Sequence, residues 1–103
     1  MNTNKVKTIY KLGASWCAPC HAFKTTFDKV SQMEQYKDLV FKEIDIEDDE
    51  DAETLVEKYQ VQSVPTTLLL DENGDIIYKL MGNVPLKDLT DVIDQALSDR
   101  EEN

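Results

Sequence analysis

The most restrictive feature of this chain is the segment WCAPCH, Trp16 to His21, which holds both of its cysteines, Cys17 and Cys20. Two residues three apart on a helix lie on one face with Cα atoms roughly 5 Å apart, within the range that a disulfide tolerates. The segment also matches CxxCH, the sequence to which a c-type haem is attached, with His21 as the iron ligand. The rest of the sequence must decide between a dithiol that cycles with a disulfide and a haem site.

The cysteines lie between a predicted strand and a predicted helix. Residues Lys5–Leu12 alternate in polarity and are rich in strand-forming side chains, which predicts a strand. From Cys17 to about Tyr36, apolar residues recur at helical spacing and predict a helix. The first cysteine would therefore sit at a helix N-terminus, where free N–H groups and the helix dipole stabilise a thiolate.

This placement gives the two thiols different expected roles. Cys17 is the expected nucleophile, and Cys20, one turn further into the helix and less exposed, is expected to resolve the mixed disulfide. Pro19 suits the first helical turn, where a missing N–H group costs nothing.

The remaining patterns predict three further strands and two further helices. The strands are predicted over Asp38–Ile46, Val64–Leu70 and Ile76–Met81, and the helices over about Asp49–Gln60 and over Leu86–Leu97. Asn73 and Gly74 supply the left-handed conformations of a tight hairpin turn. The order βαβαββα predicts an α/β fold with a mixed four-stranded sheet and three helices that cover both faces. Strands joined by helices are expected to run parallel and the hairpin pair antiparallel. Sites in such sheets lie beyond the carboxyl ends of parallel strands, where the two cysteines are.

Length and charge narrow the function classes. The 103 residues suffice for a single domain over 1–103, with fraying expected at 1–4 and 99–103. The formal charge of −10 disfavours nucleic acid and anionic membranes as partners. No apolar run approaches the roughly 20 residues of a membrane span, and no export signal is evident, so we expect a cytoplasmic location. Separately, we expect a monomer.

The cysteine count also limits the chemistry. One cysteine pair in a reducing compartment excludes a disulfide framework and favours a transient catalytic disulfide. Two Cys and one His fall short of the four ligands of a structural zinc, so no metal site is expected.

The chain resembles the thioredoxin family in several motifs. WCAPC differs by one residue from the family's WCGPC, and SVPT at Ser63–Thr66 matches its cis-proline loop. ENGD and MGN match its hairpin turn and the glycine that follows. The match spans about Lys5 to Leu97 in the family's element order, without the family's additional N-terminal strand and helix. The resemblance implies a minimal thioredoxin fold.

The resemblance also implies a set of site residues. Cys17 would attack and Cys20 would resolve, while a cis Pro65 would face the disulfide. Val64 would pair through its backbone with an extended substrate segment, as an added strand does. Four further residues would complete the substrate groove: Trp16, Thr66, Gly82 and Asn83. A trans Pro65 and a purely core role for Trp16 are the alternatives.

Two positions depart from the family. Lys11 stands where the family usually buries an Asp that assists proton movement from the resolving cysteine, and Glu43 aligns with that Asp's usual Lys partner. Our hypothesis is a charge-reversed pair in which Glu43, through water, takes over proton transfer for Cys20. The alternative is that both side chains point into solvent.

The expected function is a thioredoxin-type reduction of protein disulfides, with a flavoprotein thioredoxin reductase or a similar dithiol donor as the second partner. The Cys17–Cys20 disulfide would be the redox group, and no separate cofactor is expected. An oxidase or isomerase and a non-catalytic binding module using the same groove are the alternatives. A haem protein fits poorly, because the strand-rich pattern and the Pro65 loop have no role in it. His21 then becomes a solvent-facing helix residue or a weak tuner of the Cys17 thiolate.

Overall fold

The structure is a computed structural model that describes residues 5–98, so the expected fraying at 1–4 and 99–103 lies outside the described residues. Its elements follow the predicted order, with one 3₁₀ turn added after the first helix. They are β1 (Thr8–Gly13), α1 (Ala18–Ser31), the 3₁₀ turn (Glu34–Tyr36), β2 (Val40–Asp45), α2 (Ala52–Lys58), β3 (Thr66–Leu70), β4 (Ile76–Met81) and α3 (Leu86–Ser98). The predicted α/β class is confirmed.

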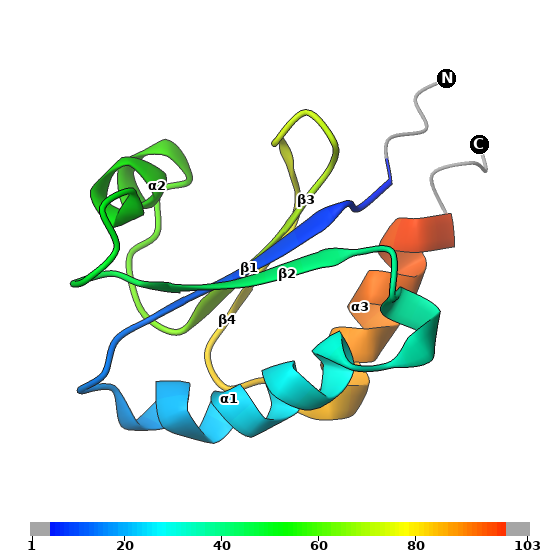
Figure 1. Cartoon of the computed structure of the whole chain (residues 1–103), viewed down its shortest axis with the longest axis horizontal. Coiled ribbons are helices and arrows are strands. Elements are labelled where there is room, and N and C mark those ends of the chain that lie inside the picture. The colour runs from blue at the N-terminus through cyan, green and yellow to red at the C-terminus, as the bar shows by residue number, and fades with distance from the viewer. Residues whose placement is uncertain (1–4, 99–103) are drawn as a thin grey trace.

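The four strands form one mixed sheet in the order β2-β1-β3-β4 (Figure 1). β1 is parallel to β2 and antiparallel to β3, and β3 is antiparallel to β4. The prediction that both helix-joined pairs run parallel is therefore wrong for β2 and β3. The seven residues of α2 span roughly 10 Å, about half the length of a six-residue strand. Because this helix is too short to carry the chain back along β2, the chain re-enters the sheet at the end where β2 stops. The start of β3 thus lies beside the end of β1.

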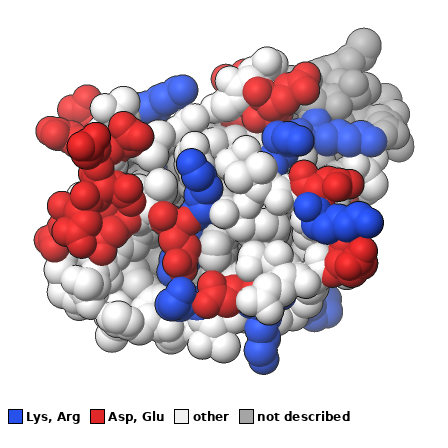
Figure 2. All heavy atoms as spheres, viewed as in Figure 1, with Lys and Arg blue, Asp and Glu red and all other residues white. Residues whose placement is uncertain are grey.

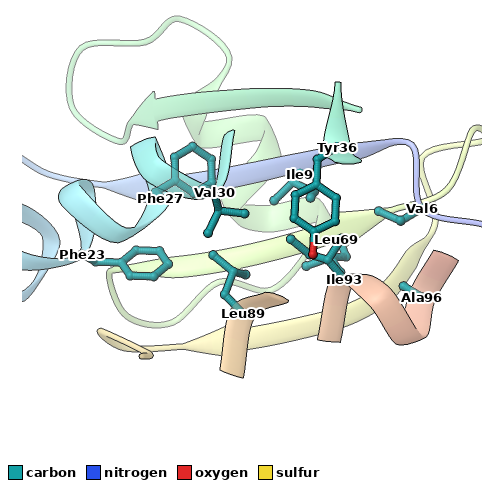
Figure 3. Packing of buried hydrophobic residues seen from close by; sticks show 10 residues of the cluster. All are labelled: Val6, Ile9, Phe23, Phe27, Val30, Tyr36, Leu69, Leu89, Ile93 and Ala96. Carbon is teal, nitrogen blue, oxygen red and sulfur yellow. The ribbon is translucent and has the colours of Figure 1, made fainter. Parts of the chain in front are cut away.

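Helices cover both faces of the sheet, as predicted. Figure 3 shows Phe23 and Phe27 of α1 and Leu89 and Ile93 of α3 packed around Ile9 and Leu69 of the central strands. On the opposite face, α2 packs against a smaller cluster. Its buried members are Leu12, Tyr59, Leu68 and Leu70. None of the helices within residues 5–98 is long and apolar enough to cross a membrane.

The first helix ends at Ser31, five residues before the predicted end at Tyr36. The N–H groups of Gln32 and Met33 donate to the carbonyls of Lys29 and Val30, three residues earlier in each case, and the helix ends there. The following 3₁₀ turn carries Tyr36 into the core, where its hydroxyl donates to Asp94 at 2.7 Å. Burial, together with that carboxylate, holds the pKa of Tyr36 well above its usual range.

The second helix begins at Ala52 rather than at Asp49. Asp45 accepts hydrogen bonds from the N–H groups of Glu47 and Asp48, and Asp49 accepts one from the N–H group of Asp45. Short acidic side chains that bond nearby backbone favour turns over helix. The acidic segment therefore forms a turn before α2 begins.

The hairpin between β3 and β4 also differs in detail from the prediction. Gly74 has a φ of 84°, but Asn73 does not share the left-handed conformation expected for it. Instead, Asp71 accepts hydrogen bonds from the N–H groups of Asn73 and Asp75 and closes the turn.

Candidate active site

The two cysteines occupy the start of α1. Cys17 is the N-cap residue with an extended backbone, and its Sγ accepts a hydrogen bond from the N–H group of Cys20 at 3.1 Å. Pro19 lies in the first turn of the helix. A disulfide joins Cys17 to Cys20 across a Cα–Cα distance of 5.2 Å. After reduction, the same N–H group and the helix dipole would stabilise a thiolate on Cys17.

The two cysteines are equally buried, each with 5% of its surface exposed, so the prediction that Cys20 is less exposed is wrong. Both cysteines belong to one buried cluster with Ala14, against which Ile46 and Val64 pack. The Sγ atom of Cys17 lies 3.7 Å from the carbonyl oxygen of Val64, which places the nucleophile beside the loop that precedes β3.

That loop contains the Val64–Pro65 peptide bond, which is cis, so the trans alternative is wrong. The hydroxyl of Thr66 donates to the carbonyl of Ser63 at 2.7 Å, and the N–H group of Gly82 donates to the carbonyl of Pro65 at 2.8 Å. Thr66, expected in the groove, is buried and supports the loop instead.

Gly82 connects the loop to the end of β4. Its φ of 91° is one that favours glycine, and the exposed Asn83 follows it. Gly82 is therefore hydrogen-bonded to the Pro65 loop at the end of β4, and Asn83 is the next residue along the chain.

Trp16 lies on the surface with 63% of its area exposed, so the alternative of a purely core role is wrong. Its indole N–H donates to Oε2 of Glu47 at 2.8 Å. The indole forms one wall of a cavity of about 370 Å³. The other lining residues are Ile46, Val56, Val61, Gln62, Ser63 and Val64.

Lys11 and Glu43 form the ion pair that the charge-reversal hypothesis expected. They are register partners on the parallel strands β1 and β2, and Nζ of Lys11 lies 2.9 Å from Oε2 of Glu43. Lys11 is only 6% exposed, and its ammonium lies 5.8 Å from the centre of the Phe27 ring. The alternative in which both side chains point into solvent is wrong.

Glu43 also binds a second lysine, which sequence reasoning missed. Nζ of Lys24 lies 3.3 Å from Oε1 of Glu43 and 3.2 Å from Oδ2 of Asp28. Burial alone would raise the pKa of Glu43, but the hydrogen bonds and charges of Lys11 and Lys24 outweigh burial and lower it. The sequence offered one indication of this contact: Lys24 follows Cys20 by four residues, so both lie on the same face of the helix.

A second cavity, of about 310 Å³, connects this ion pair to the back of the disulfide. Lys11, Glu43 and Lys24 line it together with Cys20 and His21. The cavity therefore has room for water between Cys20 and the Glu43 carboxylate, since a space of this size with charged side chains in its walls holds several water molecules.

His21 closes the turn before α1. Its Nε2 lies 2.7 Å from the carbonyl oxygen of Ser15. Because a carbonyl oxygen can only accept, Nε2 carries the proton in this contact. Nε2 is thus engaged by backbone and both cysteine sulfurs by the disulfide, so neither the iron ligand nor the attachment sulfurs of a c-type haem are free in this structure. Among residues 5–98, no group of three or more His, Cys, Asp or Glu side chains is placed to hold a metal ion.

Comparison with known proteins identifies relatives that match most of the chain, including the candidate active site. A family model described as a thioredoxin-like domain matches residues 1–97. The chain is 30% identical over 95 residues to the chloroplastic M-type thioredoxin of Spinacia oleracea, covering 92% of this chain and 50% of that protein. It is 34% identical over 71 residues to thioredoxin-1 of Caenorhabditis elegans, covering 69% and 56%. The chain thus spans about half the length of these curated relatives.

Solved structures agree with the fold. A thioredoxin from Nicotiana alata superposes with a TM-score of 0.75 at 25% identity, covering 92% of this chain and 76% of that one. Reduced thioredoxin from Schistosoma mansoni gives a TM-score of 0.73 at 25% identity, covering 93% and 83%. Together with the family match over residues 1–97, these likenesses show that the chain has the thioredoxin fold and belongs to the family of thioredoxin-like domains.

Proposed function

We propose that this protein is a thiol–disulfide oxidoreductase of the thioredoxin type that reduces protein disulfides. The observation that carries the proposal is the Cys17–Cys20 pair at the start of α1, with a backbone N–H group donating to Sγ of Cys17. Family membership supports the same chemistry.

The reaction proceeds by two thiol–disulfide exchanges. The thiolate of reduced Cys17 attacks one sulfur of the substrate disulfide, forms a mixed disulfide and releases the other substrate sulfur as a thiolate. Cys20 then loses its proton and attacks Sγ of Cys17, which releases the second substrate thiolate and forms the Cys17–Cys20 disulfide. Two electrons pass to the substrate, whose thiolates take up protons from water.

The loop around Pro65 is the proposed docking edge for the substrate backbone. The carbonyl of Val64 lies 3.7 Å from Sγ of Cys17, so an extended segment paired with Val64 brings its disulfide to the nucleophile. Trp16, Gly82 and Asn83 border this edge in our proposal, while Thr66 holds the loop from behind.

Glu43 is the proposed proton acceptor for Cys20, acting through water in the cavity that both residues line. Lys11 and Lys24 hold the carboxylate in place and keep it ionised at neutral pH. A carboxylate with a lowered pKa is a weak base, so it would pass the proton on to solvent rather than retain it.

Turnover needs a dithiol donor that returns two electrons to the disulfide, and we propose a flavoprotein thioredoxin reductase or a similar protein. In this proposal the disulfide is the only redox group. The formal charge of −10 supports proteins rather than nucleic acid or anionic membranes as partners. The monomeric state and the cytoplasmic location stay predictions.

Reduction of insulin disulfides with dithiothreitol as donor tests the proposal. The wild-type protein should accelerate reduction, and Cys17→Ser should abolish the acceleration. Cys20→Ser that is reduced beforehand and freed of dithiothreitol should accumulate a mixed disulfide with insulin, visible by mass spectrometry. A wild-type protein that binds insulin without reducing it would indicate a binding module instead. An equilibrium with glutathione that lies far towards the dithiol would indicate an oxidase or isomerase.

A further inference from the structure

The cavity beside Trp16 is an apolar pocket at the mouth of the active site. Its volume of about 370 Å³ lies within the roughly 300–1,000 Å³ range of ligand sites. Val64, which forms one wall, is also the residue whose carbonyl faces Sγ of Cys17. A polypeptide that pairs with Val64 and brings its disulfide to Cys17 would therefore lie next to this pocket.

The chain segment that supplies two of the lining residues is strongly acidic and borders the pocket. Two lining residues, Ile46 and Val56, belong to the segment 45–57, which contains eight carboxylates and no lysine or arginine. Figure 2 shows Asp and Glu side chains gathered over the region that α2 and the preceding turn occupy in Figure 1. Lys58, the first basic residue after this segment, lies over the ring of Tyr59.

One carboxylate of this border is fixed at the edge of the pocket. Glu47 follows Ile46 directly, and its Oε2 accepts the hydrogen bond from the indole of Trp16. The same contact orients the indole that walls the pocket. Apolar area and negative charge are thus joined in one surface next to the nucleophile.

We propose that this surface selects protein disulfides whose cysteine has an apolar neighbour and is flanked by lysine or arginine. The apolar side chain would enter the pocket, and the cationic side chains would face the carboxylates of segment 45–57. The inference rests on the proposed disulfide reductase function and adds a substrate class to it.

The physical basis is the complementarity between charge and pocket. Opposite charges across an interface mainly raise the association rate, and they suppress partners of like charge. Their range is the Debye length, roughly 30 Å at 10 mM salt and roughly 3 Å at 1 M. The burial of an apolar side chain depends much less on salt. The two contributions can therefore be separated in one experiment.

Four cyclic peptides, each with one intramolecular disulfide, provide the test. They share one sequence except that the flanking residues are Lys or Glu and the residue next to the cysteine is Leu or Ser. The fully reduced protein is mixed with each peptide, and the rate constant is followed by fluorescence of Trp16, the only tryptophan of the chain. At low salt we expect the Lys peptides to react about tenfold faster than the Glu peptides. At 1 M salt this ratio should fall towards one, while the preference for Leu over Ser persists.

Two matched variants locate the charge effect. Asp48→Asn, Glu50→Gln and Glu53→Gln together neutralise three exposed carboxylates of the acidic segment. Asp38→Asn, Glu72→Gln and Asp75→Asn neutralise three exposed carboxylates near the opposite ends of the strands. The first variant should lose most of the Lys preference, and the second, with the same net charge, should keep it.

The outcomes separate this inference from the proposed function. Equal rates for all four peptides would overturn the substrate preference while leaving the reductase function intact. An equal loss in both triple variants would show that only net charge matters and would also overturn it. A protein that reduces none of the peptides and no insulin would overturn the proposed function itself.

Discussion

Gly13, the last residue of β1, lies directly against Cys20: a methyl group at Gly13 would stand 3.3 Å from Sγ of Cys20. Such a contact is tolerated only if the sulfur can move. The disulfide to Cys17 restrains Sγ, whereas the free thiol can rotate away. We therefore expect Gly13→Ala to destabilise the disulfide form more than the dithiol form, by about 1 kcal/mol.

This difference is measurable as a redox equilibrium. About 1 kcal/mol shifts the equilibrium with glutathione roughly fivefold towards the dithiol. Comparing two redox states of one variant cancels the effect of alanine on the unfolded chain. An equilibrium identical to that of the wild type would show that the disulfide form accommodates the methyl group.

Glu43→Gln tests the proposed proton acceptor. The amide cannot accept a full proton, so substrate reduction should slow by about tenfold and its pH profile should change. The expected slowing is smaller than the loss of a base whose pKa matches the working pH would cause. Asp28→Asn is the matched control, because Asp28 also binds Lys24 but does not line the cavity with Cys20. Stopped-flow fluorescence of Trp16 gives the rates. An unchanged rate and pH profile in Glu43→Gln would contradict the role.

Removing Glu43 and removing Lys11 from their ion pair should lower the free energy of unfolding by different amounts. Removing Glu43 leaves a buried ammonium without its carboxylate, whereas removing Lys11 leaves Glu43 half-exposed and still bound to Lys24. Glu43→Gln should lower the free energy of unfolding by about 2 kcal/mol, and Lys11→Met by less than about 1 kcal/mol. Urea denaturation of both variants and of the double variant measures the coupling. Equal losses from both ends would contradict the burial argument.

The lowered pKa of Glu43 also predicts how stability depends on pH. A carboxyl group whose pKa is lower in the folded than in the unfolded protein stabilises the fold above its ordinary pKa of 4.5. This stabilisation is lost as the pH falls through the lower folded value. The free energy of unfolding should therefore drop less between about pH 6 and pH 3 in Glu43→Gln than in the wild type. Parallel curves for the two proteins would contradict the shift.

Thr67 should tolerate the loss of its hydroxyl. The residue is 1% exposed in β3, and its Oγ1 atom has no hydrogen-bond partner within the described residues. Valine has nearly the same shape without the unsatisfied polar group. We expect Thr67→Val to raise the free energy of unfolding by about 1 kcal/mol in urea denaturation, with unchanged insulin reduction. A loss of stability would mean that the hydroxyl is satisfied in solution.

Local patterns in the sequence were sufficient for the order of the elements and for the position of the cysteines. The repeat of two residues in a strand and the spacing of a helix can be read from residues close together in the sequence. For this reason β4 is found over the predicted range Ile76–Met81. The direction of β3 was not predictable in this way, because it depends on how far the short helix α2 carries the chain. Likewise, the end of α1 depends on the burial of Tyr36 against α3, a contact between distant residues.

The residues of the candidate site also fall into those that local motifs indicate and those that depend on distant contacts. Cys17, Cys20 and Pro65 stand in motifs, so the sequence indicates them directly. The burial of Lys11 was inferred only through a resemblance, since a lysine in a strand ordinarily indicates solvent. The role of Glu47 as the partner of Trp16 had no local signal, because 31 positions separate the two residues.

The ion pair between the first two strands also defines their alignment. In the observed register Lys11 lies opposite Glu43, with Lys42 and Ile44 at the adjacent positions of β2. A slip by one residue would set a buried ammonium against either another ammonium or an aliphatic side chain, and both arrangements are costly. A lysine in the central strand therefore favours the correct strand register, because in a misaligned sheet its buried ammonium would have no carboxylate to neutralise its charge.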